Sequence, residues 1–535
     1  MVGVVPDFKV KPMPTLPLPP LGTLPIALSA CALLCGLASP AQAGKKDDTL
    51  TWSTADELGS IDLYSLSTRA VGIIAYQVCD TLMHRNVKTR EYEPLLATQV
   101  NWVDDLTLDV TLRKGVRFHN GKPFSAEDVV YTFQHASASD SYADLRFSVD
   151  WIKSVEALAD DKVRFKLAKP NPTVMEYLSG ITPIYPKGHY DQAAMVAGPG
   201  GKTRRDWGAV LPVCTGPYKI TQFIPGKSVT MERNPDYFKG GPKGTPRIGK
   251  QVFRTIVDTQ TQIAELLTGG VDWIWSLPKD DADKIGRMGR VTVAPAPTLR
   301  ISALVFDASA RTGPNPFTDL RVRQAVNYAI DKNAIATNLV GPQSQVIHGP
   351  CYPTQFGCTD DGVTKYPYDP ARAKALLAEA GYPNGFTMTI NYLRDRPYTE
   401  AVVGYLRAVG IKAEPKFTQA AAFNPAFASG SMTLTHWNWG SVGVNDASAS
   451  FGRSFRGQGE DYARDAEVKA WLDVADTTLD AEQRKALYKK ALAKVTQQAY
   501  WAPLFTYVRN YAYNSDLDFV PTPDEISHFY AASWK

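Results

Sequence analysis

Two short stretches of the chain alternate between hydrophobic and polar positions. In the first, every second residue is apolar: Leu106, Leu108, Val110 and Leu112. In the second, the same holds for Val163, Phe165 and Leu167. A period of two places successive side chains on opposite faces of a strand. We therefore expect two strands, each with one buried face.

Other segments have the period of a helix. Apolar residues fall at i, i+3, i+4, i+7 and i+8 in one of them: Val322, Ala325, Val326, Ala329 and Ile330. These positions share one helix face, and Thr318 or Asp319 precedes them as a cap. A second helix is predicted to begin at Asp369-Pro370 and to end before Gly381. Because strand and helix signals alternate along the chain, the sequence predicts a mixed α/β fold.

The first 43 residues differ from the rest. A Pro-rich stretch with Lys9 and Lys11 is followed by residues 21–38, which carry no charge, and Pro40 then precedes Ala41-Gln42-Ala43. This order is typical of a signal peptide. We expect cleavage after Ala43 and export of a soluble mature protein to the periplasm.

Two alternatives for this segment stay open. One is an uncleaved membrane anchor, since eighteen apolar residues are close to the shortest stretch that spans a bilayer. The other is a lipoprotein attached at Cys31, because residues 28–31 fit a lipobox. The apolar run continues past Cys31, however, which places this cysteine inside the hydrophobic segment.

Four cysteines follow the predicted leader, namely Cys79, Cys214, Cys351 and Cys358, and they permit three pairings. Six residues with the composition of a loop separate Cys351 from Cys358. In an oxidising compartment we expect these two to form a disulfide. The alternative is that all four are buried free thiols.

Composition and charge narrow the function classes. The chain has 535 residues, of which 44% are hydrophobic, so it can bury the cores of two to four domains. Its net charge of +4 is small, and no run of five basic residues occurs. Nucleic acid is therefore not an expected partner. Aromatic residues make up 11%, which provides aromatic surface for a ligand.

Motifs for catalysis or metal binding are missing. The sequence has no H-E-x-x-H, no G-x-S-x-G and no histidines at metal-ligand spacing. Gly201-Lys202-Thr203 resembles the end of a phosphate-binding loop, but Val196 stands where that loop needs glycine. We expect no metal and no cofactor. An enzyme stays an alternative, because a catalytic site assembled from distant residues leaves no local trace, but no motif supports it.

Four segments resemble a known family. They are residues 112–133 (LRKGVRFHNGKPFSAEDVVYTF), 215–238 (TGPYKITQFIPGKSVTMERNPDYF), 319–335 (DLRVRQAVNYAIDKNAI) and 366–386 (YPYDPARAKALLAEAGYPNGF). Their sequence and order are similar to those of bacterial family 5 extracellular solute-binding proteins, which include the dipeptide- and oligopeptide-binding proteins of ABC importers. One departure is Cys214, where the family commonly has glycine; a disulfide to Cys79 would explain the change.

The resemblance implies the two-lobed periplasmic-binding-protein fold, of type II and of its large cluster, with the ligand cleft between the lobes. Lobe one would comprise residues 44–290 and 500–535, with an extra subdomain at about 85–190. Lobe two would comprise residues 291–499. The Pro-containing segment 291–300 is the predicted first crossing between them.

Aromatic candidates for the ligand site form two pairs. Trp273 and Trp275 lie near the predicted crossing, and Trp437 and Trp439 lie in THWNWGS. Tryptophans two apart on a strand share a face, so each pair could form a flat wall. Packing in the core is the alternative for each of them.

The charged candidates come from the resemblance. Arg396-Pro397-Tyr398 is similar to the R-P-Y of dipeptide-binding proteins, in which the arginine holds the ligand carboxylate and the tyrosine lines the pocket. A guanidinium suits this role because it donates two parallel hydrogen bonds. Asp446 lies near the family's acceptor of the ligand amine, although its local match is poor. A surface ion pair or loop charge is the alternative for both.

Together these features predict the substrate-binding component of an ABC importer. We expect it to be a monomer that captures a peptide or another small zwitterionic solute and docks on membrane permease subunits. The alternatives are a secreted hydrolase and a ligand sensor for a membrane receptor. The resemblance leaves the solute open, because family 5 pockets also accept nickel complexes, opines and sugars.

Overall fold

A computed structural model describes residues 44–66, 68–138, 141, 143–144, 146–197 and 203–535. The predicted signal peptide, its cleavage site and Cys31 lie outside these residues. The helices are α1 (Arg69–Val78), α2 (Ala126–Ser137), α3 (Val174–Gly180), α4 (Thr259–Thr268), α5 (Lys279–Gly286), α6 (Leu320–Ala329), α7 (Lys332–Ala334), α8 (Pro370–Glu379), α9 (Arg396–Ala408), α10 (Ala420–Ser429), α11 (Ser448–Ser454), α12 (Ala466–Ala475) and α13 (Ala481–Gln497).

The strands outnumber the helices, and several are only two or three residues long. They are β1 (Thr49–Thr54), β2 (Met83–Arg85), β3 (Tyr92–Pro94), β4 (Ala97–Asp104), β5 (Thr107–Leu112), β6 (Ile152–Ala159), β7 (Lys162–Leu167), β8 (Met195–Ala197), β9 (Thr203–Arg205), β10 (Tyr218–Ile224), β11 (Ser228–Arg233), β12 (Lys250–Thr255), β13 (Trp273–Ile274), β14 (Val291–Phe306), β15 (Phe386–Tyr392), β16 (Ile411–Phe417), β17 (Leu434–Trp439), β18 (Trp501–Asn514), β19 (Leu517–Asp518) and β20 (Ser533–Trp534).

The elements predicted from hydrophobic periodicity are present. The two alternating stretches form β5 and β7, which pair with each other in a sheet of order β4-β5-β7-β6. Leu106 precedes β5 and is exposed, so the buried face begins at Leu108. Asp109 of β5 is buried against the pattern, because the guanidinium of Arg164 binds both of its carboxylate oxygens at 2.7 and 2.9 Å. In α6 the cap is Asp319, whose side chain accepts from the backbone N–H of Arg321. Gly381 follows α8 with φ of 91°.

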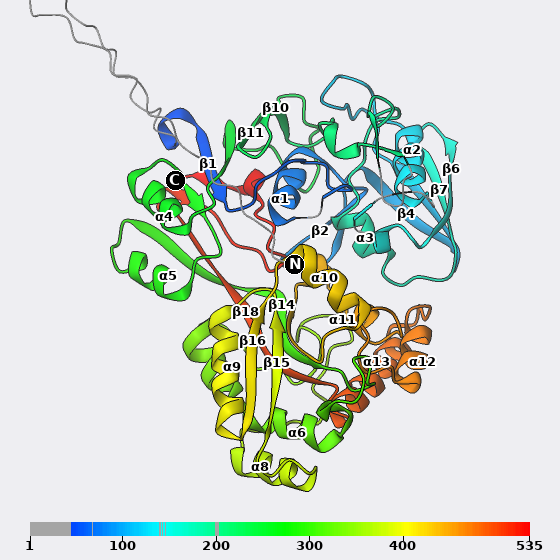
Figure 1. Cartoon of the computed structure of the whole chain (residues 1–535). Helices are drawn as coiled ribbons and strands as arrows, with labels where there is room; N and C mark the ends of the chain where they lie inside the picture. Colours follow the sequence, from blue (N-terminus) through cyan, green and yellow to red (C-terminus); the bar gives the residue numbers. More distant parts are fainter. Residues whose placement is uncertain (1–43, 67, 139–140, 142, 145, 198–202) are drawn as a thin grey trace, which may run out of the picture. The chain divides into compact units, whose positions relative to one another are not determined.

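One large sheet runs through the body, in the order β10-β11-β12-β1-β13-β18-β14-β17-β15-β16. Its two longest strands, β14 and β18, lie side by side and run from the part that carries α4 and β1 to the part that carries α6 and α8 (Figure 1). Segments from both ends of the chain thus share one sheet, since β18 pairs with β13 beside β1.

The pairing of β14 with β18 shifts register twice. The ladder is regular from Val291 to Pro297 and resumes after a break at Ile301, and a second shift follows between Ser302 and Ala303. Such an irregularity frees a residue from the ladder and redirects its side chain. Arg300 lies in this break, and its guanidinium contacts the C-terminal segment of the chain.

Separate hydrophobic cores lie on either side of this break. One contains Trp52, Trp273 and Phe529, and it extends over the N-terminal half and the end of the chain. Two others contain residues between Leu299 and Val508, and a small fourth core lies around α4 and α5. The predicted lobe boundaries at 290/291 and 499/500 stay a prediction, and this division of the cores favours a boundary inside β14 and β18.

Both cysteine pairs lie at bonding distance. The Sγ atoms of Cys79 and Cys214 are 2.05 Å apart, and those of Cys351 and Cys358 are 1.97 Å apart. The first pair lies beside Gly216, whose N–H donates to the carbonyl of Val78. A Cβ at Gly216 would meet the Val78 carbonyl carbon at 2.4 Å, so this close approach requires glycine.

The loop closed by Cys351 and Cys358 supports a neighbouring segment. Gln355 donates from Nε2 to the Ser441 hydroxyl and to the Val444 carbonyl, both at 2.8 Å. We expect Cys351→Ser with Cys358→Ser to lower the free energy of unfolding by about 2 kcal/mol, because the loop is short. Urea unfolding measures this loss. Peptide mapping without reduction should find the two cysteines linked, and free alkylation of both in protein from the native host would contradict the bridge.

The buried carboxylate of Asp62 should make the stability of the folded protein depend on pH. Its carboxylate is fully buried and accepts from the Tyr190 hydroxyl at 2.7 Å and from the Ser65 N–H at 2.8 Å. Burial raises its pKa from 3.8 to about 6 despite these hydrogen bonds. The folded state therefore holds this proton more tightly, so the contribution to stability is full below pH 3.8 and is lost as the pH rises through about 6.

Asp62→Asn should remove this dependence, since asparagine does not ionise. On going from pH 4 to pH 7, the unfolding free energy of the variant should rise by about 2 kcal/mol relative to that of the parent protein. Urea unfolding at both pH values measures the change, with exposed Asp105→Asn as control. An equal difference at both pH values would show that Asp62 does not titrate in this range.

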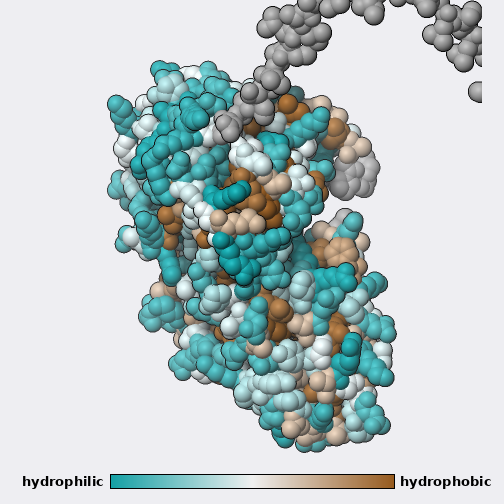
Figure 2. Space-filling view, turned by 90° about the vertical axis from the view of Figure 1, so that its left-hand side faces the viewer, coloured by the Kyte–Doolittle hydropathy of each residue, from teal (hydrophilic) through white to brown (hydrophobic). Residues whose placement is uncertain are grey.

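The surface is mainly polar. Figure 2 shows a mostly hydrophilic face, with hydrophobic residues in separate patches. Among the described residues, no helix has the length and apolar character needed to cross a bilayer.

Candidate ligand-binding site

A cavity with a volume of about 800 Å³ lies around the break in the β14–β18 ladder. Its walls come from both sides of that break, including β1 and α4 on one side and β17 and α10 on the other. It is lined by Thr54, Ala55, Asp56, Leu66, Thr68, Arg69, Asp144, Thr259, Gln262, Trp275, Ser276, Arg300, Leu393, Arg394, Phe423, Asn424, His436, Trp437, Asn438, Trp439, Gly440, Arg453, Arg509 and Glu525. Five of these residues are arginines and three are acids, so the lining is net positive.

Three of the arginines converge on one buried carboxylate. Glu525 is 1% exposed, and its oxygens lie 2.8 Å from Nε of Arg509, 3.0 Å from Arg300 and 3.5 Å from Arg69. Burial alone would raise the pKa of Glu525, but the three positive charges hold it well below its ordinary value. Glu525 is therefore ionised and neutralises part of this cluster.

Arg394 differs from those three arginines. Its side chain is exposed to the cavity, and no hydrogen bond or ion pair joins its guanidinium to another described residue. Enclosure by the cavity lowers the pKa of Arg394, and the charges of Arg300 and Arg509 lower it further. An unpaired guanidinium near other positive charges is a favourable site for an anionic group.

The backbone around Arg394 is fixed by its neighbour. Asp395 has φ of 65°, a left-handed conformation that is unusual for a residue other than glycine. Its Oδ2 accepts from the Tyr507 hydroxyl at 2.6 Å and from Nδ2 of Asn438 at 2.9 Å. Such backbone strain in a residue other than glycine persists where surrounding contacts enforce it, and it often occurs at functional sites.

Tryptophans form one wall of the cavity. The rings of Trp437 and Trp439 stack with centroids 5.9 Å apart. The guanidinium of Arg453 lies 4.7 Å from the Trp439 ring centroid and binds Glu460. Trp275 lines the cavity from the other side of the break. These rings can cover apolar parts of a ligand.

Of the residues predicted from the sequence, Trp275, Trp437 and Trp439 line the cavity, whereas Trp273 does not. Trp273 is 0% exposed, and its ring packs in the core against Trp52 and Phe529. Although the two rings stack, β13 ends at Ile274, and only Trp275 extends beyond the sheet to the cavity.

The predicted charged residues lie outside the cavity lining. Arg396 is 75% exposed and pairs with Glu400 one helical turn along α9, while Tyr398 packs against Phe505. Asp446 is buried and accepts two hydrogen bonds from Arg484, at 2.6 and 2.8 Å. The left-handed turn at Asp395 explains the displacement, because it separates the direction of Arg394 from that of Arg396.

The sequence analysis did not identify Arg394, Arg300, Arg509 or Glu525. Arg394 lies two residues before Arg396 in the same segment, NYLRDRPYTE. The resemblance therefore identified the correct segment but selected the other arginine. The other three come from distant parts of the chain and form no local motif. Among the described residues, no group of three or more potential metal ligands occurs.

Comparisons with known proteins agree with this architecture. Heme-binding protein A of Haemophilus influenzae is 29% identical over 461 residues, which cover 80% of this chain and 81% of that protein. Glutathione-binding protein GsiB of Pectobacterium atrosepticum is 28% identical, with 75% and 78% covered. The solved structure of HbpA2 from Haemophilus parasuis superposes with a TM-score of 0.75 at 25% identity, covering 91% of this chain and all of that one.

A family model also matches this chain. Residues 91–462 match the model described as bacterial extracellular solute-binding proteins, family 5. The two sets of cores, the crossing strands and the cavity between them fit the two-lobed fold of the structural relatives. The chain therefore belongs to the bacterial extracellular solute-binding proteins of family 5, the substrate-binding components of ABC import systems.

Proposed function

We propose that this protein captures a peptide or another small zwitterionic solute in the periplasm and delivers it to a membrane permease. In this proposal Arg394 holds a carboxylate of the ligand, and Trp275, Trp437 and Trp439 cover its apolar parts. The protein acts as a monomer and catalyses no reaction. The observation that carries the proposal is the unpaired guanidinium of Arg394 in a positively charged cavity of about 800 Å³.

The relatives bind ligands that share this chemistry. Heme and glutathione, named for two of them, each carry two carboxylates. The cavity lining favours a peptide over heme, because it contains no cysteine, methionine or tyrosine. Its one histidine, His436, already uses both ring nitrogens, at 2.8 Å from the Ser302 hydroxyl and 2.7 Å from the Thr399 hydroxyl.

A ligand held in this cavity would also favour closure of the two lobes around it. The cavity has walls on both sides of the break in the central sheet, and a ligand stabilises the state with which it makes more contacts. Capture by closure is what a carrier needs before it docks on a permease. A membrane receptor could use the same device, which makes a sensor the second candidate.

A thermal-shift series tests the proposed ligand class. The protein, freed of ligand by partial denaturation, is titrated with reduced glutathione, a pool of dipeptides, the same dipeptides as C-terminal amides, and hemin. A ligand that binds the folded state raises the melting temperature by an amount that grows with the logarithm of its concentration above its Kd. We expect such a concentration-dependent rise with free-carboxylate peptides and a much smaller rise with the amides. A rise with hemin alone, or equal rises with acids and amides, would contradict the proposal.

A further inference from the structure

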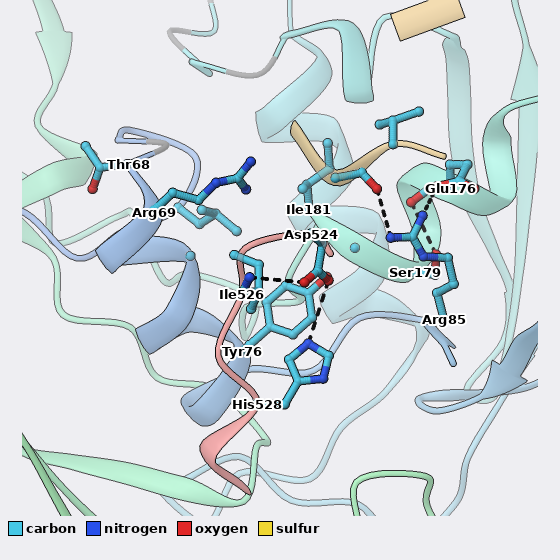
Figure 3. Close-up of a pocket in the computed structure, with 15 residues that line it drawn as sticks. Thr68, Arg69, Tyr76, Arg85, Glu176, Ser179, Ile181, Asp524, Ile526 and His528 are labelled. Carbon is cyan, nitrogen blue, oxygen red and sulfur yellow. Dashed lines mark hydrogen bonds and ion pairs between the residues drawn. The ribbon is translucent and has the colours of Figure 1, made fainter. Parts of the chain in front are cut away.

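A second, smaller cavity lies beside the main one. Thr68 and Arg69 line both cavities. Its volume is about 40 Å³, which is room for a small polar group or a few waters. Figure 3 shows Asp524 in this cavity, between Arg69 on one side and the Arg85–Glu176 pair on the other. Its walls also include Gly443 and Val444, which follow β17, so it draws on both sides of the central break.

Asp524 presents an open acceptor to this cavity. The residue is 6% exposed, and its Oδ1 accepts from the Thr522 hydroxyl at 2.6 Å and from the Ile526 N–H at 3.0 Å. No described residue donates a hydrogen bond to Oδ2. The nearest charged or titratable partner is Nε2 of His528 at 3.8 Å, which is too long for a hydrogen bond.

His528 provides a second open position. The residue is 9% exposed, and its Nδ1 lies 3.1 Å from the Tyr530 hydroxyl. Its Nε2 is buried and has no hydrogen-bond partner among the described residues. Buried polar atoms are almost always paired, so the unpaired Nε2 of His528, which faces the same small cavity as Oδ2 of Asp524, indicates a missing occupant.

The conformation of the C-terminal segment separates two consecutive acids. Glu525 has φ of 60°, and it lines the main cavity, where arginines neutralise it. Asp524 lines the small cavity and forms no ion pair with an arginine or lysine among the described residues, although the charges of Arg69 and Arg85 act on it from the cavity walls. The strained turn therefore directs one carboxylate to the arginine cluster and leaves the other for a separate contact.

Most other acids near the site are already paired. Glu176 binds Arg85 at 2.7 Å and accepts from the Tyr92 hydroxyl at 2.8 Å. Asp446, the acceptor that the sequence suggested for a ligand amine, is bound by Arg484. The competitor is Asp56, which lines the main cavity and is half-buried.

We propose that the small cavity is a subsite for an ammonium group of the ligand, held by Oδ2 of Asp524 and Nε2 of His528. The inference rests on the proposed function, because Arg394 in the main cavity would hold the carboxylate of the same molecule. The subsite selects zwitterions, since a ligand without the ammonium would leave the buried Asp524 charge unpaired.

Equilibrium dialysis with mass spectrometry tests the subsite. The probes are an equimolar pool of dipeptides with free amines and the same pool N-acetylated, both with free carboxylates. We expect the protein to retain the free-amine pool at least about tenfold more strongly, as for other buried charged contacts. In Asp524→Asn, which keeps the Oδ1 contacts, this preference should fall to within about twofold. Asp518→Asn, an exposed change in the same part of the chain, should keep it.

Two further variants separate the alternatives. Gly180→Ala adds a methyl group to a residue that lines the small cavity, 3.4 Å from the Tyr76 hydroxyl, and it should also reduce the preference. It serves as the test if Asp524→Asn does not fold. Loss of the preference in Asp56→Asn, with Asp524→Asn and Gly180→Ala unchanged, would overturn the subsite. Equal retention of both pools would overturn the subsite alone, whereas retention of neither would contradict the proposed ligand class as well.

Discussion

Replacing Arg394 with alanine should lower ligand affinity at least tenfold and leave the melting temperature of the ligand-free protein nearly unchanged. The guanidinium forms no hydrogen bond or ion pair with another described residue, so its removal breaks no such interaction of the folded protein. A bound carboxylate would lose its charged donor inside an enclosed cavity, a loss typically worth about 2 to 5 kcal/mol. Titration calorimetry with the peptide selected by thermal shift measures the affinity, and calorimetric melting measures the stability.

The chain provides a matched control for this prediction. Arg396 lies two residues away and pairs with Glu400 on the surface, so Arg396→Ala should leave affinity within about twofold. Arg394→Lys should restore only part of the affinity, because an ammonium cannot donate two parallel hydrogen bonds. If Arg396→Ala weakens binding and Arg394→Ala does not, Arg396 and not Arg394 holds the ligand carboxylate.

Replacing Glu525 with alanine should destabilise the ligand-free protein by about 3 to 5 kcal/mol. Glu525 is buried and contacts Arg69, Arg300 and Arg509, whose positive charges would then repel one another without compensation. These arginines hold α1, β14 and β18 together beside the cavity. The loss should therefore affect unfolding of the whole body, which urea unfolding monitored by tryptophan fluorescence measures.

The pH dependence of this destabilisation tests whether the charge of Glu525 is its cause. Because the arginines hold the pKa of Glu525 below its ordinary value of 4.5, its contribution to stability is present above that pH and declines as the pH falls below it. Glu525→Gln keeps the shape and loses the charge, so the gap between parent and variant should narrow on acidification below about pH 4.5. A gap that is constant between pH 7 and pH 3 would show that packing, and not charge, explains the effect.

The sequence predicted those parts of the fold that depend on local patterns. Alternation at residues 106–112 and 163–167 predicted β5 and β7, and the helical period with its caps predicted α6 and α8. The family resemblance predicted the two-lobed class. Single-strand patterns do not specify which distant strands pair, so the ten-stranded order and the break at Arg300 were not predictable.

The candidate site was predicted in part for the same reason. Trp437 and Trp439 lie on one strand, and their shared wall followed from their spacing. The choice between Arg394 and Arg396 depends on the left-handed turn at Asp395, which the hydroxyl of Tyr507 and the amide of Asn438 support. Those partners lie far away in the sequence. Asp446 was predicted from the resemblance as the acceptor of the ligand amine, and its pairing with Arg484 also depends on tertiary structure.

Mass spectrometry of the ligand bound under native conditions tests the central claim most directly. The protein and its Arg394→Ala variant are incubated with a mixture of peptides, separated from unbound solute and denatured gently to release what they hold. We predict one small carboxylate-bearing molecule per parent protein and strongly reduced retention by the variant. Retention of the same molecule in equal amount by both proteins would contradict the claim that Arg394 forms the ligand site.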